Sequence, residues 1–190
     1  MSSFLTYALE QNGIPNVFTI LDDFFAIEVP GHFVPDALAI ARDLMQRLGL
    51  PLSPKEHKTH DWRTRCEWYG LVIDSVSMTV ELGEEKVTRY SALAAKVLAG
   101  EATVAEARSL VGKLGWAAVA VWGISTHSRP IRDWLQKIDA AGCPDWFRAH
   151  PDKPARAALH WIIAHIRSNN GLAAVVGNPA PTQLATADGT

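Results

Sequence analysis

One short stretch, residues 17–27, most constrains what this chain can fold into. The runs Val17–Ile20 and Phe24–Ile27 are rich in β-branched and aromatic residues, and they flank the pair Asp22 and Asp23. Such runs favour β-strands, and Asp is common in tight turns because its side chain bonds nearby backbone. The stretch therefore predicts a β-hairpin with both carboxylates at its tip. Two adjacent carboxylates suit a divalent cation or lie in a solvated turn, and the hairpin alone leaves both interpretations open.

The remainder of the chain predicts an α+β fold. Apolar residues recur at helical spacing. The segments with this spacing are residues 1–11, 34–48, 84–98, 103–122, 130–141 and 154–167. The runs Cys66–Ile73 and Val76–Leu82 predict a second hairpin, joined by a turn at residues 74–75. Thr103 and Glu106 match a capping box, which marks the start of a helix.

The composition indicates a globular protein that does not span a membrane. Of its 190 residues, 48% are hydrophobic, which is enough for a core and excludes the disordered class. Its two cysteines, Cys66 and Cys143, are no disulfide framework and predict a reducing, intracellular setting. No signal peptide opens the chain. Its most apolar stretch, Leu114–Trp122, is shorter than the roughly 20 residues that a bilayer requires.

Charge is distributed unevenly along the chain. Residues 1–50 carry six acids and two bases, whereas residues 84–137 carry eight bases and five acids. An acidic first part followed by a mildly basic helical part suits a metal site beside a polyanion.

Six segments carry motifs in a fixed order. They are Ile20–Asp23 (ILDD), Leu48–Pro54 (LGLPLSP), Lys58-Thr59, Trp68–Leu71 (WYGL), Ser109–Leu114 (SLVGKL) and Ala155–Gly171. In this order they resemble parts of the reverse transcriptases of retrotransposons, most closely the DIRS-like branch. The parts are the YxDD hairpin, the segment after the palm helix, the motif D lysine, the primer grip, the thumb helix and the connection helix.

The resemblance implies a division of the chain into four parts. Residues 1–82 would form a partial polymerase palm with the catalytic-type and primer-grip-type hairpins. Residues 83–142 would form thumb-like helices, and residues 143–171 a connection-like helix. Residues 172–190, which carry prolines and small polar residues, would form a flexible tail.

The resemblance also implies RNA-directed DNA polymerase chemistry. Nucleotidyl transfer in that family uses two metal ions, Mg²⁺ or Mn²⁺. Asp22 would ligate metal directly, Asp23 would be partly structural, and Lys58 would protonate the pyrophosphate leaving group. The residues themselves leave Lys58 open to being an ordinary solvated loop lysine.

Further residues would hold an RNA or DNA primer–template duplex. Trp68, Tyr69 and Gly70 would brace the primer strand, and Arg108 and Lys113 would meet duplex phosphates, which positions the duplex without reading sequence. Two other interpretations stay open. Trp68 also suits packing against the palm, and the two cations also suit a solvated helix face.

The 190-residue chain departs from the family ahead of its hairpin. Ile20 stands where the family usually has Tyr, and Glu10 is the only acid before Asp22. The family's upstream aspartate and fingers are not recognisable, so we expect a fragment that needs a partner chain to supply them. We predict no DNA synthesis by the purified chain in a primer-extension assay with Mg²⁺ or Mn²⁺. Robust nucleotide incorporation would contradict this prediction.

Two other hypotheses remain. The first is a non-catalytic module that binds duplex phosphates through the thumb-like helices, with salt-dependent affinity. The second is a metal site at His57, His60 and Cys66, although the second ligand pair of strong zinc motifs is absent.

Overall fold

The chain forms two compact units, Met1–Tyr69 and Gly70–Thr190. The computed structural model describes residues 2–20, 23–28, 34–50, 52–53, 59 and 61–173, with backbone only for Ser2, Ser3, Ile20, Asp23, Leu172 and Ala173. Each unit has its own hydrophobic core and combines helices with antiparallel strands. The expected α+β class is therefore confirmed. No helix in the described part of the chain has the length and apolar character needed to cross a membrane.

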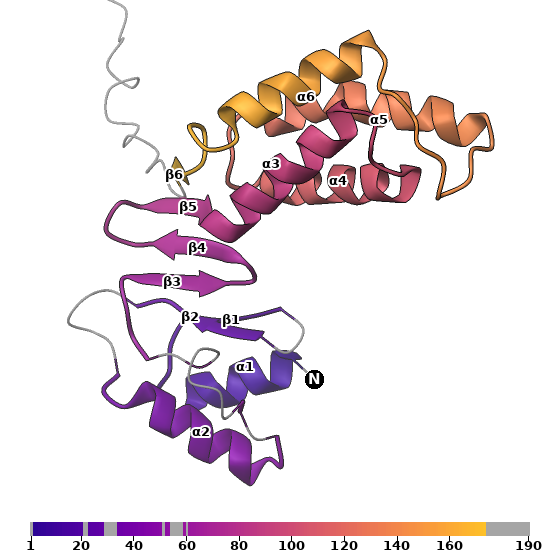
Figure 1. Ribbon diagram of the computed structural model, residues 1–190. Helices are drawn as coiled ribbons and strands as arrows, with labels where there is room; N and C mark the ends of the chain where they lie inside the picture. The colour runs from indigo at the N-terminus through magenta and orange to yellow at the C-terminus, as the bar shows by residue number, and fades with distance from the viewer. Residues whose placement is uncertain are drawn as a thin grey trace, which may run out of the picture. The chain divides into compact units, whose positions relative to one another are not determined.

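The first unit is built around the predicted hairpin (Figure 1). Its elements are α1 (Ser2–Gln11), β1 (Val17–Ile20), β2 (Asp23–Ala26), α2 (Ala37–Arg47) and β3 (Arg65–Trp68). Strands β1 and β2 pair antiparallel, with Val17 opposite Ala26 and Ile20 opposite Asp23. The hairpin that the β-prone runs predict is thus confirmed, with only two residues between its strands.

The two faces of this hairpin have different neighbours. Val17 is buried in a core shared with Leu9 of α1 and Leu44 of α2. Because side chains alternate along a strand, the pair Phe18 and Phe25 points to the opposite face. There Phe18 is half exposed and Phe25 stacks on another ring of the same unit.

Helix α2 begins later than its sequence predicts. We expected residues 34–48, but Asp36 has a left-handed backbone (φ +58°) and its side chain makes no capping hydrogen bond. A right-handed helix cannot include that conformation, so α2 starts at Ala37. Leu44 and Met45 are buried on the apolar face of α2, whereas Leu48 lies past the helix end and is exposed.

The second unit joins a small sheet to four helices (Figure 1). Its elements are β4 (Leu71–Asp74), β5 (Thr79–Leu82), α3 (Glu84–Leu98), α4 (Val104–Ala117), α5 (Ile124–Ala140), α6 (Lys153–His165) and β6 (Leu172–Ala173). Helix α3 packs on α4 and α6, and α5 packs on the same two helices. All four helices bury side chains in one cluster, so the thumb-like and connection-like segments share a core.

Two helix starts follow the sequence closely. Helix α3 has the expected bounds, with acids in its first turn, where they suit the helix dipole. At α4, Thr103 Oγ1 accepts from the Glu106 N–H (3.2 Å) and Glu106 Oε2 accepts from the Thr103 N–H (2.9 Å), which confirms the capping box. A hydrogen bond from Lys96 and the bond from the Thr103 N–H lower the pKa of Glu106.

The second hairpin is present, because β4 pairs antiparallel with β5, but its bounds differ from those predicted. Residues 66–73 were expected to form one strand, but a turn at Tyr69 and Gly70 separates β3 from β4. Both residues have positive φ, +51° and +74°, which an extended strand excludes. The next turn is also longer than expected, because Asp74 Oδ1 accepts from the N–H groups of Val76 (2.9 Å) and Ser77 (3.0 Å) and β5 starts only at Thr79.

The boundary between α4 and α5 was also predicted wrongly. Helix α4 ends at Ala117 instead of about Trp122, and α5 begins at Ile124 and runs through Pro130. Pro130 costs the helix one backbone hydrogen bond. The helix continues because Ile124, Ser128 and Ile131 all bury their side chains at helical spacing.

The first two residues of the expected tail are part of the sheet. Leu172 and Ala173 form β6, which pairs antiparallel with β5. The amide group of Asn170 fixes this junction, because its oxygen accepts from the Leu82 N–H (2.8 Å) and its nitrogen donates to the Leu82 carbonyl (2.9 Å). The rest of that segment, residues 174–190, lies outside the described residues.

Candidate nucleic-acid interface

The carboxylate hairpin places Asp23 at the first position of β2, opposite Ile20. Asp22 and Lys58 lie outside the described residues, and only the backbone of Asp23 is described. Among the described residues, no group of three or more histidine, cysteine or acidic side chains is arranged to hold a metal ion. The roles expected for Asp22, Asp23 and Lys58 therefore stay predictions.

The alternative metal site is only partly within the described chain. His57 and His60 lie outside it, and Cys66 is a half-buried free thiol on β3. Burial raises the pKa of the Cys66 thiol, and the nearby charge of Arg63 offsets this in part. A raised pKa disfavours the thiolate that would bind a metal.

Trp68 and Tyr69 have different environments. The Trp68 ring stacks on Phe25 of the hairpin, with ring centroids 4.9 Å apart, so the packing interpretation of Trp68 describes its position. Its buried indole nitrogen has no hydrogen-bond partner among the described residues. Tyr69 lies in the turn with its ring 41% exposed, so it presents the more accessible aromatic surface.

The carbonyl group of Gly70 is bound by Lys86, a residue outside the sequence motifs. The Lys86 ammonium donates to the Gly70 carbonyl at 2.6 Å. A Cβ at Gly70 would lie 1.6 Å from the Lys86 nitrogen, and the residue has φ +74°. The positive φ of the turn favours glycine at position 70, whereas the Lys86 ammonium, at the end of a flexible side chain, could move aside; the turn therefore explains a glycine here without any bound strand.

Arg108 is already paired with two carboxylates. It lies on α4 and bonds Asp139 of α5 at 2.5 Å and Asp145 of the following loop. The hydrogen bond with Asp139, followed by that with Asp145, raises the pKa of the guanidinium. A phosphate approaching Arg108 would have to compete with both carboxylates, so Arg108 ties three segments together more directly than it offers a free charge.

Lys113 lies on the same helix and is less constrained. Its ammonium donates to the Ser109 hydroxyl one turn earlier, and within the described chain it forms no ion pair. A hydroxyl leaves the positive charge uncompensated. Of the two cations expected to meet phosphate, Lys113 is therefore the more available.

Part of the exposed face of α4 is bare, because two of its residues are glycines and carry no side chain. Arg108, Gly112 and Gly115 recur at positions i, i+4 and i+7 and are all exposed, while Leu110 and Leu114 are fully buried on the other side. A Cβ at Gly112 or Gly115 would meet no atom within 4 Å. Neither glycine is needed for packing inside the protein, although each costs the helix about 1 kcal/mol relative to alanine.

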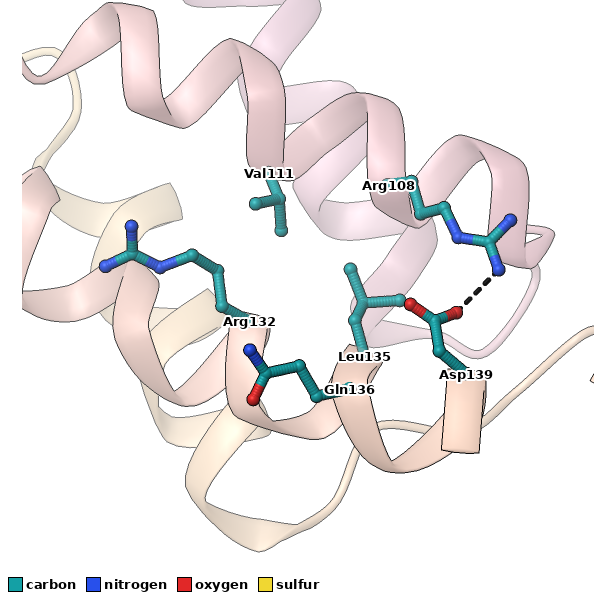
Figure 2. Close-up of a pocket in the computed structure, with 6 residues that line it drawn as sticks. All are labelled: Arg108, Val111, Arg132, Leu135, Gln136 and Asp139. Atoms are coloured by element: carbon teal, nitrogen blue, oxygen red, sulfur yellow. Dashed lines mark hydrogen bonds and ion pairs between the residues drawn. The ribbon is translucent and has the colours of Figure 1, made fainter. Parts of the chain in front are cut away.

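A shallow groove of about 230 Å³ lies between α4 and α5 (Figure 2). Its lining residues are Arg108, Val111, Arg132, Leu135, Gln136 and Asp139. Figure 2 shows Val111 and Leu135 between Arg132 on one side and the paired Arg108 and Asp139 on the other. Arg132 forms no ion pair with any carboxylate of the described residues, so it adds a second available cation next to α4.

Comparisons with known protein families, with curated proteins and with solved structures gave no match to this chain.

Proposed function

We propose that this chain is part of a reverse-transcriptase-like polymerase and that its α4 face holds a primer–template duplex of RNA or DNA. The ordered motifs of the sequence support the family, and the bare face of α4 carries the proposal for duplex contact. Lys113 and Arg132 would supply positive charge to phosphates on that side of the bundle. Such contacts hold a duplex without reading its sequence.

The argument from the glycines is energetic. Gly112 and Gly115 lower the stability of α4, and nothing within the described protein approaches either of them. Where two residues on the exposed face of a helix are glycines, another molecule can come within contact distance of the helix backbone. A duplex backbone is an extended surface that benefits from this access, and alanine at either position would hold it away by one methyl group.

The carboxylate hairpin would complete the polymerase role. Carboxylate oxygens are suitable ligands for Mg²⁺ or Mn²⁺, and Asp22 and Asp23 would hold such ions at the primer end. When bound, the ions would stabilise charge on the attacking and leaving oxygens. Lys58 would deliver a proton to the leaving group. The further carboxylate of a two-metal site, together with the fingers, would come from a separate chain or segment.

The principal test is Gly112→Ala. This variant should be more stable than the wild type by about 0.5–1 kcal/mol, because alanine is the better helix former. It should also bind a labelled primer–template duplex several-fold more weakly, because the added methyl group lies on the proposed contact face. Urea unfolding followed by circular dichroism measures the stability, and fluorescence anisotropy at low salt measures the affinity.

Lys113→Ala provides the charge test, with Lys153→Ala at the start of α6 as the matched control. Only Lys113→Ala should weaken duplex binding and reduce its dependence on salt. Absence of duplex binding by the wild-type chain at low salt would reject the proposal. Unchanged affinity in both Gly112→Ala and Lys113→Ala would reject the α4 face as the site of contact.

A non-catalytic nucleic-acid-binding module is the second candidate. The observation that favours it is that the contact face lies wholly within the second unit and needs no carboxylate of the hairpin. Isothermal titration calorimetry with Mn²⁺ distinguishes the polymerase fragment from the non-catalytic module. A polymerase-type hairpin should bind Mn²⁺ in a manner that Asp22→Asn abolishes, whereas duplex binding without any Mn²⁺ binding would favour the module.

A further inference from the structure

The loop between α5 and α6, residues 141–152, leaves two aromatic rings in solvent. The side chain of Trp146 is 75% exposed and that of Phe147 is 41% exposed. Large aromatic rings contribute most of their stabilisation when they are buried. Two adjacent exposed rings therefore need an explanation outside the packing of this unit.

The exposure of these rings is not a consequence of a loosely held loop. The Phe147 carbonyl accepts from the Val104 N–H (2.9 Å) and the Asp145 carbonyl accepts from the Ala105 N–H (3.1 Å). These two donors are in the first turn of α4, where no bond within the helix is available to them. Arg108 also bonds the Asp145 side chain. The backbone is thus fixed against α4 while most of Trp146 and part of Phe147 stay exposed, which is how a preorganised binding surface is built.

The charges around the loop favour an anionic ligand. Both carboxylates of the loop have a cationic partner: Asp152 pairs with Lys137 at 2.8 Å, and Asp145 pairs with Arg108, which it shares with Asp139. Hydrogen bonds from the Lys137 ammonium and from the Ala155 N–H lower the pKa of Asp152. By contrast Arg148, which follows Phe147, is exposed and forms no ion pair within the described chain. Arg148 is therefore the charged side chain next to the rings that stays available to an anionic ligand.

We propose that Trp146 and Phe147 are a stacking platform for the bases of a single-stranded nucleic acid, with Arg148 at its phosphates. Every base offers a flat apolar face to an aromatic ring, so such a platform tolerates any sequence. Base pairs inside a duplex already stack on each other, so only an unpaired strand offers those faces. The platform rests on the proposed nucleic-acid role of the chain, but it uses a different ligand form and different residues from the α4 face.

The test measures binding of the full chain to a labelled oligothymidylate of about 12 nucleotides, a length that single-strand sites span. Trp146→Ala should weaken this binding about 10-fold or more, since loss of one stacked base has an effect of this order. Trp146→Phe should keep most of the affinity, and Arg148→Ala should weaken it and lower its salt dependence. Ultraviolet crosslinking followed by mass spectrometry should place the modified peptide at residues 146–147.

The matched control is Trp122→Ala, which removes another exposed indole (69%) from a turn held by backbone bonds to Asn169. It should leave single-strand binding unchanged, and the melting temperature of each variant should match the wild type because both rings are exposed. Failure of the wild-type chain to bind the oligonucleotide, or equal affinity in Trp146→Ala, would overturn the platform. Light scattering would identify a contact between copies of the chain instead, if Trp146→Ala changed the oligomeric state without changing the affinity for the oligonucleotide.

The platform and the α4 contact are separable in the same assays. Single-strand binding that depends on Trp146, without duplex binding, supports the platform and rejects the duplex role. Duplex binding that depends on Gly112 and Lys113, with single-strand binding insensitive to Trp146, supports the duplex role and rejects the platform.

Discussion

Replacing Leu114 with alanine should lower the free energy of unfolding of the second unit by about 3 kcal/mol, within the range that such substitutions cost in protein cores. Leu114 lies in the middle of α4 and has no solvent-exposed surface. It belongs to a cluster to which all four helices contribute. Replacing its isobutyl side chain with a methyl group loses apolar burial and leaves a cavity that helices packed on both sides cannot close.

Urea unfolding of the full chain, followed by circular dichroism and by tryptophan fluorescence, measures this loss. Val119→Ala is the control, because its side chain is 52% exposed and should change stability by less than about 0.5 kcal/mol. The helical part should still unfold in one transition in Leu114→Ala, since α3 to α6 share one core. Separate transitions for α6 and α3–α4 would contradict the single core.

Gly123→Ala should have an effect of similar size, about 3 kcal/mol, from two causes that add. Gly123 has φ +87°, a conformation that costs an L-residue about 1–2 kcal/mol. Its new Cβ would lie 2.6 Å from Cη2 of Trp161. That ring cannot easily move away, because it is stacked between His127, at 3.7 Å between ring centroids, and His165, at 4.8 Å. Overpacking of this kind typically costs about 1–3 kcal/mol.

Gly142→Ala separates the two causes. Gly142 also has positive φ (+69°), but a Cβ there would meet nothing within 4 Å. It should therefore show the backbone cost alone, about 1–2 kcal/mol. The double variant Gly123→Ala with Trp161→Ala should recover the steric part, measured as a coupling energy in a double-mutant cycle. Equal costs for Gly123→Ala and Gly142→Ala would show that the stacked ring yields freely.

Local signals in the sequence determined much of this fold. The runs of β-branched and aromatic residues on either side of Asp22 and Asp23 predicted the β1–β2 hairpin, whose strands pair in register. Thr103 and Glu106, three residues apart, predicted the start of α4, and acids in the first turn with Gly100 just past the end predicted the bounds of α3. In each case the residues that stabilise the feature are close neighbours in the chain, so the pattern carries the physical cause.

The sequence predicted element boundaries wrongly where contacts between residues far apart in the chain determine the structure. Tyr69 and Gly70 form a turn whose carbonyl is bonded by Lys86, and α5 runs through Pro130 because its buried face continues on both sides. Leu172 and Ala173 join β5 because Asn170 bonds Leu82. These partners are chosen by packing, which a local pattern does not encode.

For the candidate site, too, the sequence named the residues, whereas tertiary contacts determined which of them are available. The sequence selected Lys113 and Arg108 by their motif, but only tertiary contacts show that Arg108 is paired with Asp139 and Asp145 while Lys113 is not. Gly112 was visible in the sequence as part of SLVGKL, with Gly115 just after it, yet the lack of neighbours around both glycines was not. Whether a charge or a bare backbone is available to a ligand depends on which distant side chains fold against it, and that is settled only when the helices pack.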